Sequence, residues 1–386
     1  MANNNNKDKC NVPNLRFPEF SGEWEMSSIG EQFELYSGNT PSRMNKNQFD
    51  GSINWITSGE LKEHYISDTK EKISEEAAKN NSLKLLPVGT FVIAIYGLEA
   101  NGVRGTCSIT TRESTISQAC MAFTSKMDIQ NEFLYSWYKK HGNIIGIKYA
   151  QGTKQQNLSY DIIERFNISY PCMEEQKKLI RFISLIDQRI ATQNKIIEDL
   201  KKLKSAISER LFNAIKGDVV VLEDIGDVVK GKQINGEFLS ESGKYYVMNG
   251  GIEPSGFYND YNVEANTISI SEGGNSCGYV QFNACPFGSG GHCYTIQNTT
   301  DNVKTEYLYQ FLKSKESEIM KLRIGSGLPN IQKKDLAKFK ITIPNISEQK
   351  VISAFLSSFE RKADVEMNFV NLLLEEKQYL LRQMFI

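Results

Sequence analysis

An internal repeat is the strongest constraint on how this 386-residue chain folds. The step Glu175-Gln176-Lys177 returns 173 residues later as Glu348-Gln349-Lys350. The same offset relates six further positions: Gly152 and Gly325, Asn157 and Asn330, Leu158 and Ile331, Phe166 and Phe339, Ile168 and Ile341, and Pro171 and Pro344. An ordered series of matches predicts two copies of one structural unit, the first with extra residues in its early loops.

Each copy is predicted to end in a long helix. In the first copy, residues spaced alternately by three and four positions form a seam of Ile183, Ile186, Ile190, Gln193, Ile197, Leu200, Lys204, Ile207 and Leu211. In the second copy the seam is Leu356, Phe359, Ala363, Glu366, Val370, Leu373, Lys377, Leu380 and Met384. This spacing over four heptads indicates a coiled coil, with a core helix of a bundle as the alternative.

The connectivity predicts that the two helices are antiparallel. A compact second globule holds the end of the first helix close to the start of the second. Residues 174–214 then form a helix of about 60 Å at 1.5 Å per residue. We expect a register in which Lys204 faces Glu366 and Gln193 faces Lys377, because opposite charges in one layer fix the pairing.

The predicted organisation has five segments and a pseudo-two-fold axis. They are an N-terminal tail (1–23), a first globule (24–173), a first helix (174–214), a second globule (215–346) and a second helix (347–386). The fold class is mixed α/β. The aromatic segments FLYSWYKK from Phe133 and YLYQFLKS from Tyr307 have helical spacing, so we interpret them as core segments rather than as platforms for stacking bases.

Composition limits the classes of function. A net charge of −1 argues against a protein that coats nucleic acid indiscriminately, although it allows local basic faces. Seven scattered cysteines fit reduced thiols, and no apolar run approaches the roughly 20 residues that a membrane span needs. The first ten residues lack the apolar core of a signal peptide. We therefore expect a cytoplasmic protein without a membrane partner.

The motifs of common enzymes are absent from the sequence. It contains neither a G-x-x-x-x-G-K-[ST] phosphate loop nor an H-E-x-x-H zinc motif. The spacing of Cys277, Cys285, His292 and Cys293 does not fit a zinc site, so we predict buried thiols there. We accordingly predict no catalytic residue and no metal site.

Polar loops bracketed by glycines recur in both copies. Arg and Lys side chains suit guanine edges, Asn and Gln suit adenine, and Ser or Thr contact bases or phosphates. The candidate DNA-binding residues are Thr40, Arg43, Ser58, Lys154, Gln155, Gln156 and Asn157 in the first copy, and Lys232, Gln233, Asn249 and Asn330 in the second. A solvated loop is the alternative for any one of them. Residues 302–340 also hold nine Lys or Arg against four Asp or Glu, an excess that suits phosphates.

The chain resembles the specificity subunit of type I restriction-modification enzymes over nearly its whole length. The resemblance rests on VPNLRFPEFSGEWE, on SGNTPSR with WITSGEL, on EEQKKLI and SEQKVI at the helix starts, and on the order globule, helix, globule, helix. It departs in the second copy, where Gly231-Lys232-Gln233 stands in place of the Thr-Pro-Ser-Arg step.

This resemblance implies a non-catalytic subunit with two target-recognition domains, each of which reads one half of a split, asymmetric double-stranded DNA sequence. The helices are then a spacer that docks two methylation subunits, and restriction subunits join the complex. Cofactors are expected only on those partners: S-adenosylmethionine, ATP and Mg. The alternatives are a coiled-coil adaptor that binds only proteins and a fused DNA-modifying enzyme.

Overall fold

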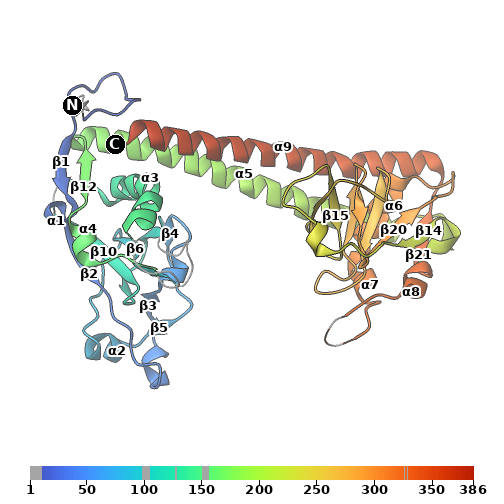
Figure 1. Cartoon of the computed structure of the whole chain (residues 1–386), viewed down its shortest axis with the longest axis horizontal. Helices are drawn as coiled ribbons and strands as arrows, with labels where there is room; N and C mark the ends of the chain where they lie inside the picture. The colour runs from blue at the N-terminus through green and yellow to red at the C-terminus, as the bar shows by residue number, and fades with distance from the viewer. Residues whose placement is uncertain (1–10, 98–104, 127, 150–155, 326, 328) are drawn as a thin grey trace. The chain divides into compact units, whose positions relative to one another are not determined.

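The computed structural model describes residues 11–97, 105–126, 128–149, 156–325, 327 and 329–386 (Figure 1). The chain forms two compact units: Met1–Thr192 with Val370–Ile386, and Gln193–Phe369. Both units include part of each of two long helices, α5 (Met173–Ala214) and α9 (Ile346–Met384). Each unit therefore combines one predicted globule with one end of the helix pair.

The first unit is built on a five-stranded sheet of order β2-β10-β6-β8-β4. Its strands are β2 (Phe33–Ser37), β10 (Cys120–Ser125), β6 (Phe91–Ala94), β8 (Cys107–Thr110) and β4 (Tyr65–Ile66). A smaller sheet contains β5 (Lys72–Ile73), β3 (Ile53–Ile56) and β9 (Ser114–Ile116), with β3 and β9 parallel. Two further antiparallel pairs are β1 (Glu25–Ser28) with β12 (Asn167–Tyr170), and β7 (Tyr96–Gly97) with β11 (Gln156–Asn157). The helices are α1 (Ile29–Gln32), α2 (Glu75–Asn80), α3 (Asn131–Tyr149) and α4 (Tyr160–Glu164).

The second unit repeats this topology, as the sequence repeat predicts. Its main sheet has the order β14-β20-β17-β18, with β14 (Asp227–Lys230), β20 (Cys293–Gln297), β17 (Thr267–Ser271) and β18 (Val280–Asn283). The smaller sheet contains β16 (Gly256–Tyr258), β15 (Tyr245–Met248) and β19 (Gly288–Ser289), again with one parallel pair. β13 (Asp218–Val221) pairs with β21 (Lys340–Ile343), and the helices are α6 (Thr305–Ser314), α7 (Glu316–Met320) and α8 (Lys333–Ala337). Among the described residues, β4 of the first unit has no counterpart here.

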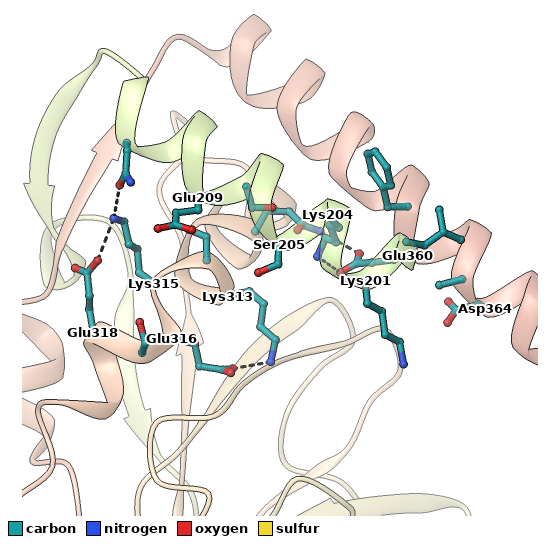
Figure 2. A pocket seen from close by; sticks show the side chains of 18 residues that line it. Lys201, Lys204, Ser205, Glu209, Lys313, Lys315, Glu316, Glu318, Glu360 and Asp364 are labelled. Atoms are coloured by element: carbon teal, nitrogen blue, oxygen red, sulfur yellow. Dashed lines mark hydrogen bonds and ion pairs between the residues drawn. The ribbon is translucent and has the colours of Figure 1, made fainter. Parts of the chain in front are cut away.

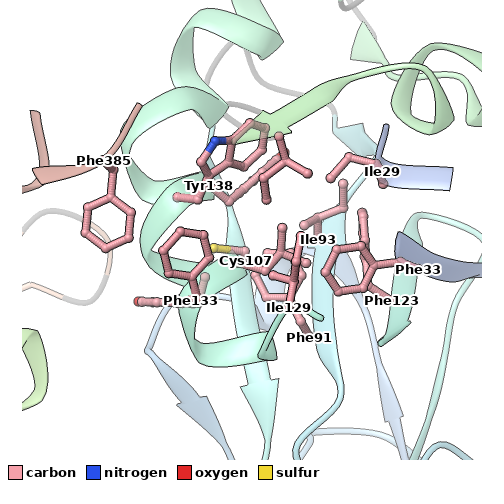
Figure 3. Close-up of a cluster of buried hydrophobic side chains, with 14 of the residues drawn as sticks. Ile29, Phe33, Phe91, Ile93, Cys107, Phe123, Ile129, Phe133, Tyr138 and Phe385 are labelled. Carbon is pink, nitrogen blue, oxygen red and sulfur yellow. The ribbon is translucent and has the colours of Figure 1, made fainter. Parts of the chain in front are cut away.

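Aromatic side chains fill the core between the main sheet and α3 in the first unit (Figure 3). The ring of Phe91 lies 5.3 Å from that of Phe123 and 5.8 Å from that of Tyr138. Phe133 packs on Phe385 from the end of the chain at 5.2 Å. Burying each such side chain contributes about 1.5–3 kcal/mol. The predicted aromatic segment of α3 is therefore core, and Tyr307, Leu308, Phe311 and Leu312 are buried in the second unit in the same way.

The glutamine of the repeated three-residue step has the same structural role in both copies. Gln349 is fully buried near the start of α9 and makes three hydrogen bonds. Its Nε2 donates to the carbonyl oxygens of Asn302 and Pro344, both at 2.9 Å. Its Oε1 accepts from the backbone N–H of Lys304 at 2.8 Å, at the residue that caps the N-terminus of α6. One side chain thus joins the long helix to the aromatic helix of its globule.

Gln176 makes the same three hydrogen bonds in the first unit. It is also fully buried, and its Nε2 donates to the carbonyl oxygens of Asp128 at 2.6 Å and Pro171 at 3.0 Å. Its Oε1 accepts from the backbone N–H of Gln130 at 3.0 Å, just before α3 begins. The glutamine that both copies share therefore holds each long helix to its globule. Its amide is needed because the site offers two carbonyl acceptors and one N–H donor.

The two long helices run antiparallel within each unit. In the first unit, Leu179 and Ile183 of α5 share a buried cluster with Leu380 and Met384 of α9. In the second unit, Leu211 of α5 packs with Leu356 and Ile352 of α9. All predicted seam positions are buried or half-buried. Those at the core of the seam include Ile197, Glu366 and Val370.

The predicted register of the seam is wrong. Gln193 donates a hydrogen bond to Glu366, and Lys204 lies 2.7 Å from Glu360. In the first unit, Lys377 lies 2.5 Å from Asp187. Lys204 and Lys377 are equivalent in the repeat, so both units contain the same ion pair. The expectation failed because it chose the register that places opposite charges in one layer, whereas Gln193 faces Glu366, its own equivalent in the repeat.

Residues of the predicted N-terminal tail contact both helices. Arg16 forms a bidentate pair with Glu175 at 2.6 and 2.8 Å, and the backbone N–H of Leu15 donates to the Gln383 carbonyl oxygen at 3.0 Å. Glu175 is 1% exposed, whereas its equivalent Glu348 is exposed. The segment from residue 11 onward is therefore part of the first unit rather than a free tail.

The buried glutamine predicts a large and local stability cost. Gln349→Ala leaves the Lys304 N–H and two carbonyl oxygens without partners, so we expect the free energy of unfolding to fall by about 2–4 kcal/mol. Gln378→Ala, at an exposed position of the same helix, is the matched control and should change it by less than about 0.5 kcal/mol. Urea denaturation followed by circular dichroism measures both; equal effects would contradict the role of Gln349.

The observed register predicts which charge reversal is rescued. Glu360→Lys places two cations together in a half-buried site and should destabilise the second unit by about 1–3 kcal/mol. Adding Lys204→Glu should recover part of the loss, because Glu360 also accepts from Tyr309 and Gln310. The same Lys204→Glu change should give no recovery in a Glu366→Lys background. Rescue of Glu366→Lys instead would restore the register predicted from the sequence.

Candidate nucleic-acid interface

Five segments, two of them in the short strands β7 and β11, meet at one end of the main sheet in the first unit. The backbone N–H of Asn39 donates to the Ile116 carbonyl oxygen at 3.2 Å, and that of Ile95 donates to Ala119 at 2.9 Å. The backbone N–H of Leu158 donates to the Ile95 carbonyl oxygen at 2.8 Å. We name this surface, made of residues 38–40, 57–58, 95–97, 117–119 and 157, the first loop face.

The second unit builds the same surface with the same backbone bonds. The N–H of Lys232 donates to the Ser289 carbonyl oxygen at 3.0 Å, and that of Glu272 donates to His292 at 2.9 Å. The N–H of Ile331 donates to the Glu272 carbonyl oxygen at 2.8 Å. Residues 231–233, 249–250, 272–274, 290–292 and 330 form the second loop face. Both copies thus present corresponding loops on a common scaffold.

A glycine begins each face because two backbone segments meet there. A Cβ atom at Gly38 would lie 1.9 Å from the Ile116 carbonyl oxygen, and one at Gly231 would lie 2.2 Å from that of Gly290. No side chain fits at such distances. These glycines let the loop after β2 or β14 cross the loop before β10 or β20.

The structure places several predicted residues of the first copy on its loop face. Thr40 is half-buried and its backbone N–H donates to Asn39 Oδ1 at 2.8 Å. Ser58 is half-buried at the start of a short 3-10 helix (Ser58–Glu60). Asn157 is exposed and pairs with Tyr96. Lys154 and Gln155 lie outside the described residues, and only the backbone of Gln156 is described, in β11.

Arg43 has structural partners of its own. Its guanidinium forms a bidentate pair with Glu71 at 2.6 and 2.8 Å, and this hydrogen bonding raises the Arg43 pKa. The same group lies over the rings of Phe49 and Trp55, with centroids 5.1 and 5.7 Å away. The pair of guanidinium N–H donors that would bind a guanine base is therefore occupied by Glu71 in this structure.

All four predicted residues of the second copy lie on its loop face. Lys232 and Gln233 are exposed after β14. Asn249 Oδ1 accepts from the backbone N–H of His292 at 3.1 Å, so this residue also shapes the face. Asn330 is exposed and bridges to Gly273. Three segments far apart in sequence thus bring these side chains to one surface.

The basic excess of residues 302–340 is partly neutralised. Lys313 pairs with Glu316 at 2.5 Å, and Lys315 pairs with Glu318 at 3.0 Å. Six further cations of this segment are exposed: Lys321, Arg323, Lys333, Lys334, Lys338 and Lys340. The charge available to phosphates therefore lies outside α6, in the segments that flank Asn330.

A groove of about 700 Å³ between α5, α6, α7 and α9 of the second unit was not anticipated from the sequence (Figure 2). Lys204, Lys313 and Lys315 line it, and each pairs with a nearby carboxylate. Lys315 also donates to Asn213 Oδ1 at 2.9 Å. Four lysines, Lys201 included, line the groove against five carboxylates (Glu209, Glu316, Glu318, Glu360 and Asp364), so it lacks the positive excess of a phosphate site.

The sequence reasoning also missed a charged cluster at the second loop face. Lys230 Nζ lies 2.6 Å from Glu272 Oε1, and the Tyr294 hydroxyl donates to the same oxygen at 3.0 Å. His292 Nδ1 lies 3.7 Å from Glu272 Oε2. The available signal was the alignment of the two copies, in which charged residues replace Ser37 and Ile95.

The thiol prediction is correct for two of the three cysteines. Cys277 and Cys293 are buried, and burial raises the pKa of Cys293 to about 11. Cys285 is exposed, which contradicts the prediction, because it lies in a surface turn beyond β18. In the described part of the chain, no three His, Cys, Asp or Glu side chains are grouped to hold a metal. None of the described helices is long and apolar enough to span a membrane.

Comparison with known proteins identifies one family over most of the chain. The model described as type I restriction modification DNA specificity domain matches residues 21–202 and again residues 216–373. Its two matches coincide with the two copies of the sequence repeat.

Curated relatives cover the chain in whole or in part. The specificity subunit of the type I restriction enzyme MjaIX from Methanocaldococcus jannaschii is 26% identical, over 83% of this chain and 83% of that protein. The EcoR124I/EcoR124II specificity subunit from Escherichia coli is 28% identical over 49% of this chain and 46% of that protein.

Solved structures share the fold. The S subunit of a type I restriction-modification system from M. genitalium has a TM-score of 0.60 at 19% identity and covers 97% of this chain and 99% of its own. A chain from a study of assembly and conformational transition of the type I system has a TM-score of 0.61 at 16% identity, covering 94% and 97%. At these identities the likeness concerns the fold alone.

The close backbone approach at Gly231 predicts that two glycine-to-alanine changes in the same loop differ in their effect on stability. Gly231→Ala introduces a Cβ against the Gly290 carbonyl oxygen and should cost about 1–3 kcal/mol of unfolding free energy while disordering the second loop face. Gly236→Ala meets no atom within 4 Å and should be nearly neutral. Chemical denaturation compares the two. Equal stability of both variants would show that the close approach is not required.

Proposed function

The chain belongs to the type I restriction-modification DNA specificity family, and we propose that it reads a bipartite, asymmetric DNA sequence, one half with each loop face. The observation that carries this proposal is the duplicated loop face. Polar side chains from separate segments converge on the same end of the same sheet in both units. Such a surface supplies the donors and acceptors that read base edges, while exposed cations nearby meet phosphates.

The asymmetry of the site follows from different chemistry on equivalent positions. Asn39 in the first face corresponds to Lys232 in the second, because each donates its backbone N–H to the equivalent carbonyl oxygen. Ile95 corresponds to Glu272 by the same criterion. Two faces with one geometry and different side chains recognise two different half-sites.

We propose a non-catalytic role in a larger complex located in the cytoplasm. Methylation subunits carry S-adenosylmethionine, and restriction subunits carry ATP and Mg²⁺. This chain supplies the DNA sequence specificity of the complex, which is the property that the family description names.

A second heptad seam on the long helices supports the docking of methylation subunits. On α9 it contains six of the eight exposed large apolar residues: Val351, Phe355, Val365, Phe369, Leu372 and Tyr379. On α5 the exposed large apolar residues Leu185, Ile196 and Leu203 occupy the equivalent series. The three- and four-residue spacing that buries the first seam thus recurs on an exposed flank of each helix.

Such a seam fits a helix better than any other partner surface. Apolar residues at heptad spacing form the holes into which apolar side chains of a partner amphipathic helix pack. We therefore propose that helices of two methylation subunits dock here, and that α5 and α9 also act as a spacer between the half-sites.

Methylation mapping tests the proposed function. The chain is co-expressed with its methylation subunits, and methylated bases are mapped in the host genome with and without this gene. We expect a split, asymmetric methylated sequence that appears only with the gene. A methylation pattern that is unchanged by deletion of the gene would refute the proposal and favour an adaptor that binds only proteins.

The second seam predicts a selective docking defect. Val365→Glu with Leu372→Glu adds two charges to exposed positions of the seam, so stability should change by less than about 1 kcal/mol while affinity for methylation subunits falls at least tenfold. Asn368→Glu with Asn371→Glu adds the same charge at exposed positions outside the seam and should leave affinity unchanged. Co-purification and calorimetric titration measure the difference; equal affinities would refute this docking surface.

A further inference from the structure

The second loop face contains a buried carboxylate oxygen that lacks a hydrogen-bond partner. Glu272 follows β17 and is 4% exposed. Its Oε1 accepts from Lys230 and Tyr294. Its Oε2 is buried and accepts no hydrogen bond from any described residue, and His292 Nδ1 lies 3.7 Å from it. One acceptor of a charged group is therefore left unused at the base of the face.

The first unit shows that the scaffold does not require this cluster. Met121 pairs with Ser37 across β10 and β2, as Tyr294 pairs with Lys230 across β20 and β14. Ile95 takes the place of Glu272. Ser37, Ile95 and Met121 in one copy therefore correspond to Lys230, Glu272 and Tyr294 in the other.

The physical chemistry of burial argues against a purely structural role for Glu272. The Glu272 carboxylate is buried while its partner Lys230 is 50% exposed, and a buried charge seldom stabilises a fold more than a well-packed apolar residue does. The first copy shows that an apolar residue, Ile95, packs at this position. A buried acceptor without a donor is a further cost. A polar cluster that the fold does not require and that does not increase its stability is typical of a binding site.

The surroundings of Glu272 place it among the residues that we assign to DNA reading. Asn249 holds the backbone of His292 through its Oδ1 atom at 3.1 Å. Gln233 Oε1 lies against Gly291, where an added Cβ would be 2.5 Å from it. The His292 side chain is 62% exposed and its Nδ1 lies 3.7 Å from Glu272 Oε2, so this imidazole beside the carboxylate is not locked in the core.

We propose that Glu272 is a specificity-determining residue that accepts a hydrogen bond from an exocyclic amino group of a base in the second half-site. This inference rests on the proposed DNA-reading function. In the major groove only cytosine N4 and adenine N6 offer such donors, whereas guanine and thymine present acceptors. When His292 turns aside, Oε2 accepts from the amine and repels the acceptor edges. Lys230 and Tyr294 hold the carboxylate in place as positioning residues.

Replacement of the carboxylate by its isosteric amide tests the inference. The variant Glu272→Gln is assayed as the complex with methylation subunits, by methylation mapping and by binding to oligonucleotides substituted at each half-site position. We expect one position of the second half-site to relax from cytosine or adenine toward guanine or thymine, with discrimination falling about tenfold or more. The first half-site should keep its letters.

A matched control separates a local effect from a change of net charge. Glu223→Gln removes the same charge at an exposed position in the short 3-10 helix (Leu222–Asp224) that precedes β14, whereas Lys230 ends that strand. It should leave every letter of both half-sites unchanged. Relaxation in this control equal to that of Glu272→Gln would overturn the inference.

Two outcomes overturn the inference while the proposed function stands. One is uniformly weaker binding with unchanged letters, which makes Glu272 a support for a phosphate contact. The other is unchanged letters with unchanged affinity. If Glu272→Gln unfolds, the triple variant Lys230→Ser, Glu272→Ile and Tyr294→Met replaces the cluster with the side chains of the first copy and should fold. This variant should lose the preference for cytosine or adenine at the same position of the second half-site. Retention of that preference then overturns the inference. Absence of methylation with the wild-type chain instead refutes the proposed function.

Discussion

The hydrogen bonds of one buried glutamine in each copy tie together the parts on which the rest of the structure depends. Gln176 and Gln349 each connect the start of a long helix, the strand end before it and the segment that begins the aromatic helix of the globule. Because these groups are fully buried, any change in their alignment leaves polar atoms without partners. The glutamine therefore fixes the globule on its helix, and the loop face is carried by the sheet that packs on that globule's core.

Each loop face shows how one scaffold carries two sets of chemistry. Backbone hydrogen bonds and the glycines Gly38 and Gly231 hold the loops in the same arrangement in both units. Side chains at the ends of the strands are then free to differ, as Ile95 and Glu272 do. Divergence at such positions changes what is read with little effect on the backbone, because the main chain already satisfies its own hydrogen bonds.

Periodic features of the sequence predicted the fold well, whereas the contacts of individual loop residues, which follow no period, could not be predicted. The repeat predicted two similar globules, and heptad spacing with connectivity predicted antiparallel helices, because burial of an apolar face leaves a signal at every third or fourth residue. The register of the seam was predicted incorrectly because it was chosen to pair opposite charges, whereas the helices pair the equivalent residues Gln193 and Glu366. Loop residues such as Arg43 carry no period, so their partners Glu71 and Trp55 could not be inferred. The aligned copies show charged residues at the positions of Ser37 and Ile95, but the strand pairing that brings Lys230 beside Tyr294 is specified only by the structure.

The proposal that the helix pair sets the distance between the half-sites is tested most directly by lengthening it. One heptad inserted after Ile197 and one after Val365 extends both helices. The contact of Gln193 with Glu366 is kept on one side of the two insertions and that of Lys204 with Glu360 on the other. The spacer grows by about 10 Å at 1.5 Å per residue, or about 3 base pairs. Methylation mapping of this variant should show the same two half-sites across a longer gap, or lost activity if the added twist of the DNA prevents both contacts. Unchanged half-sites across an unchanged gap would contradict the spacer role.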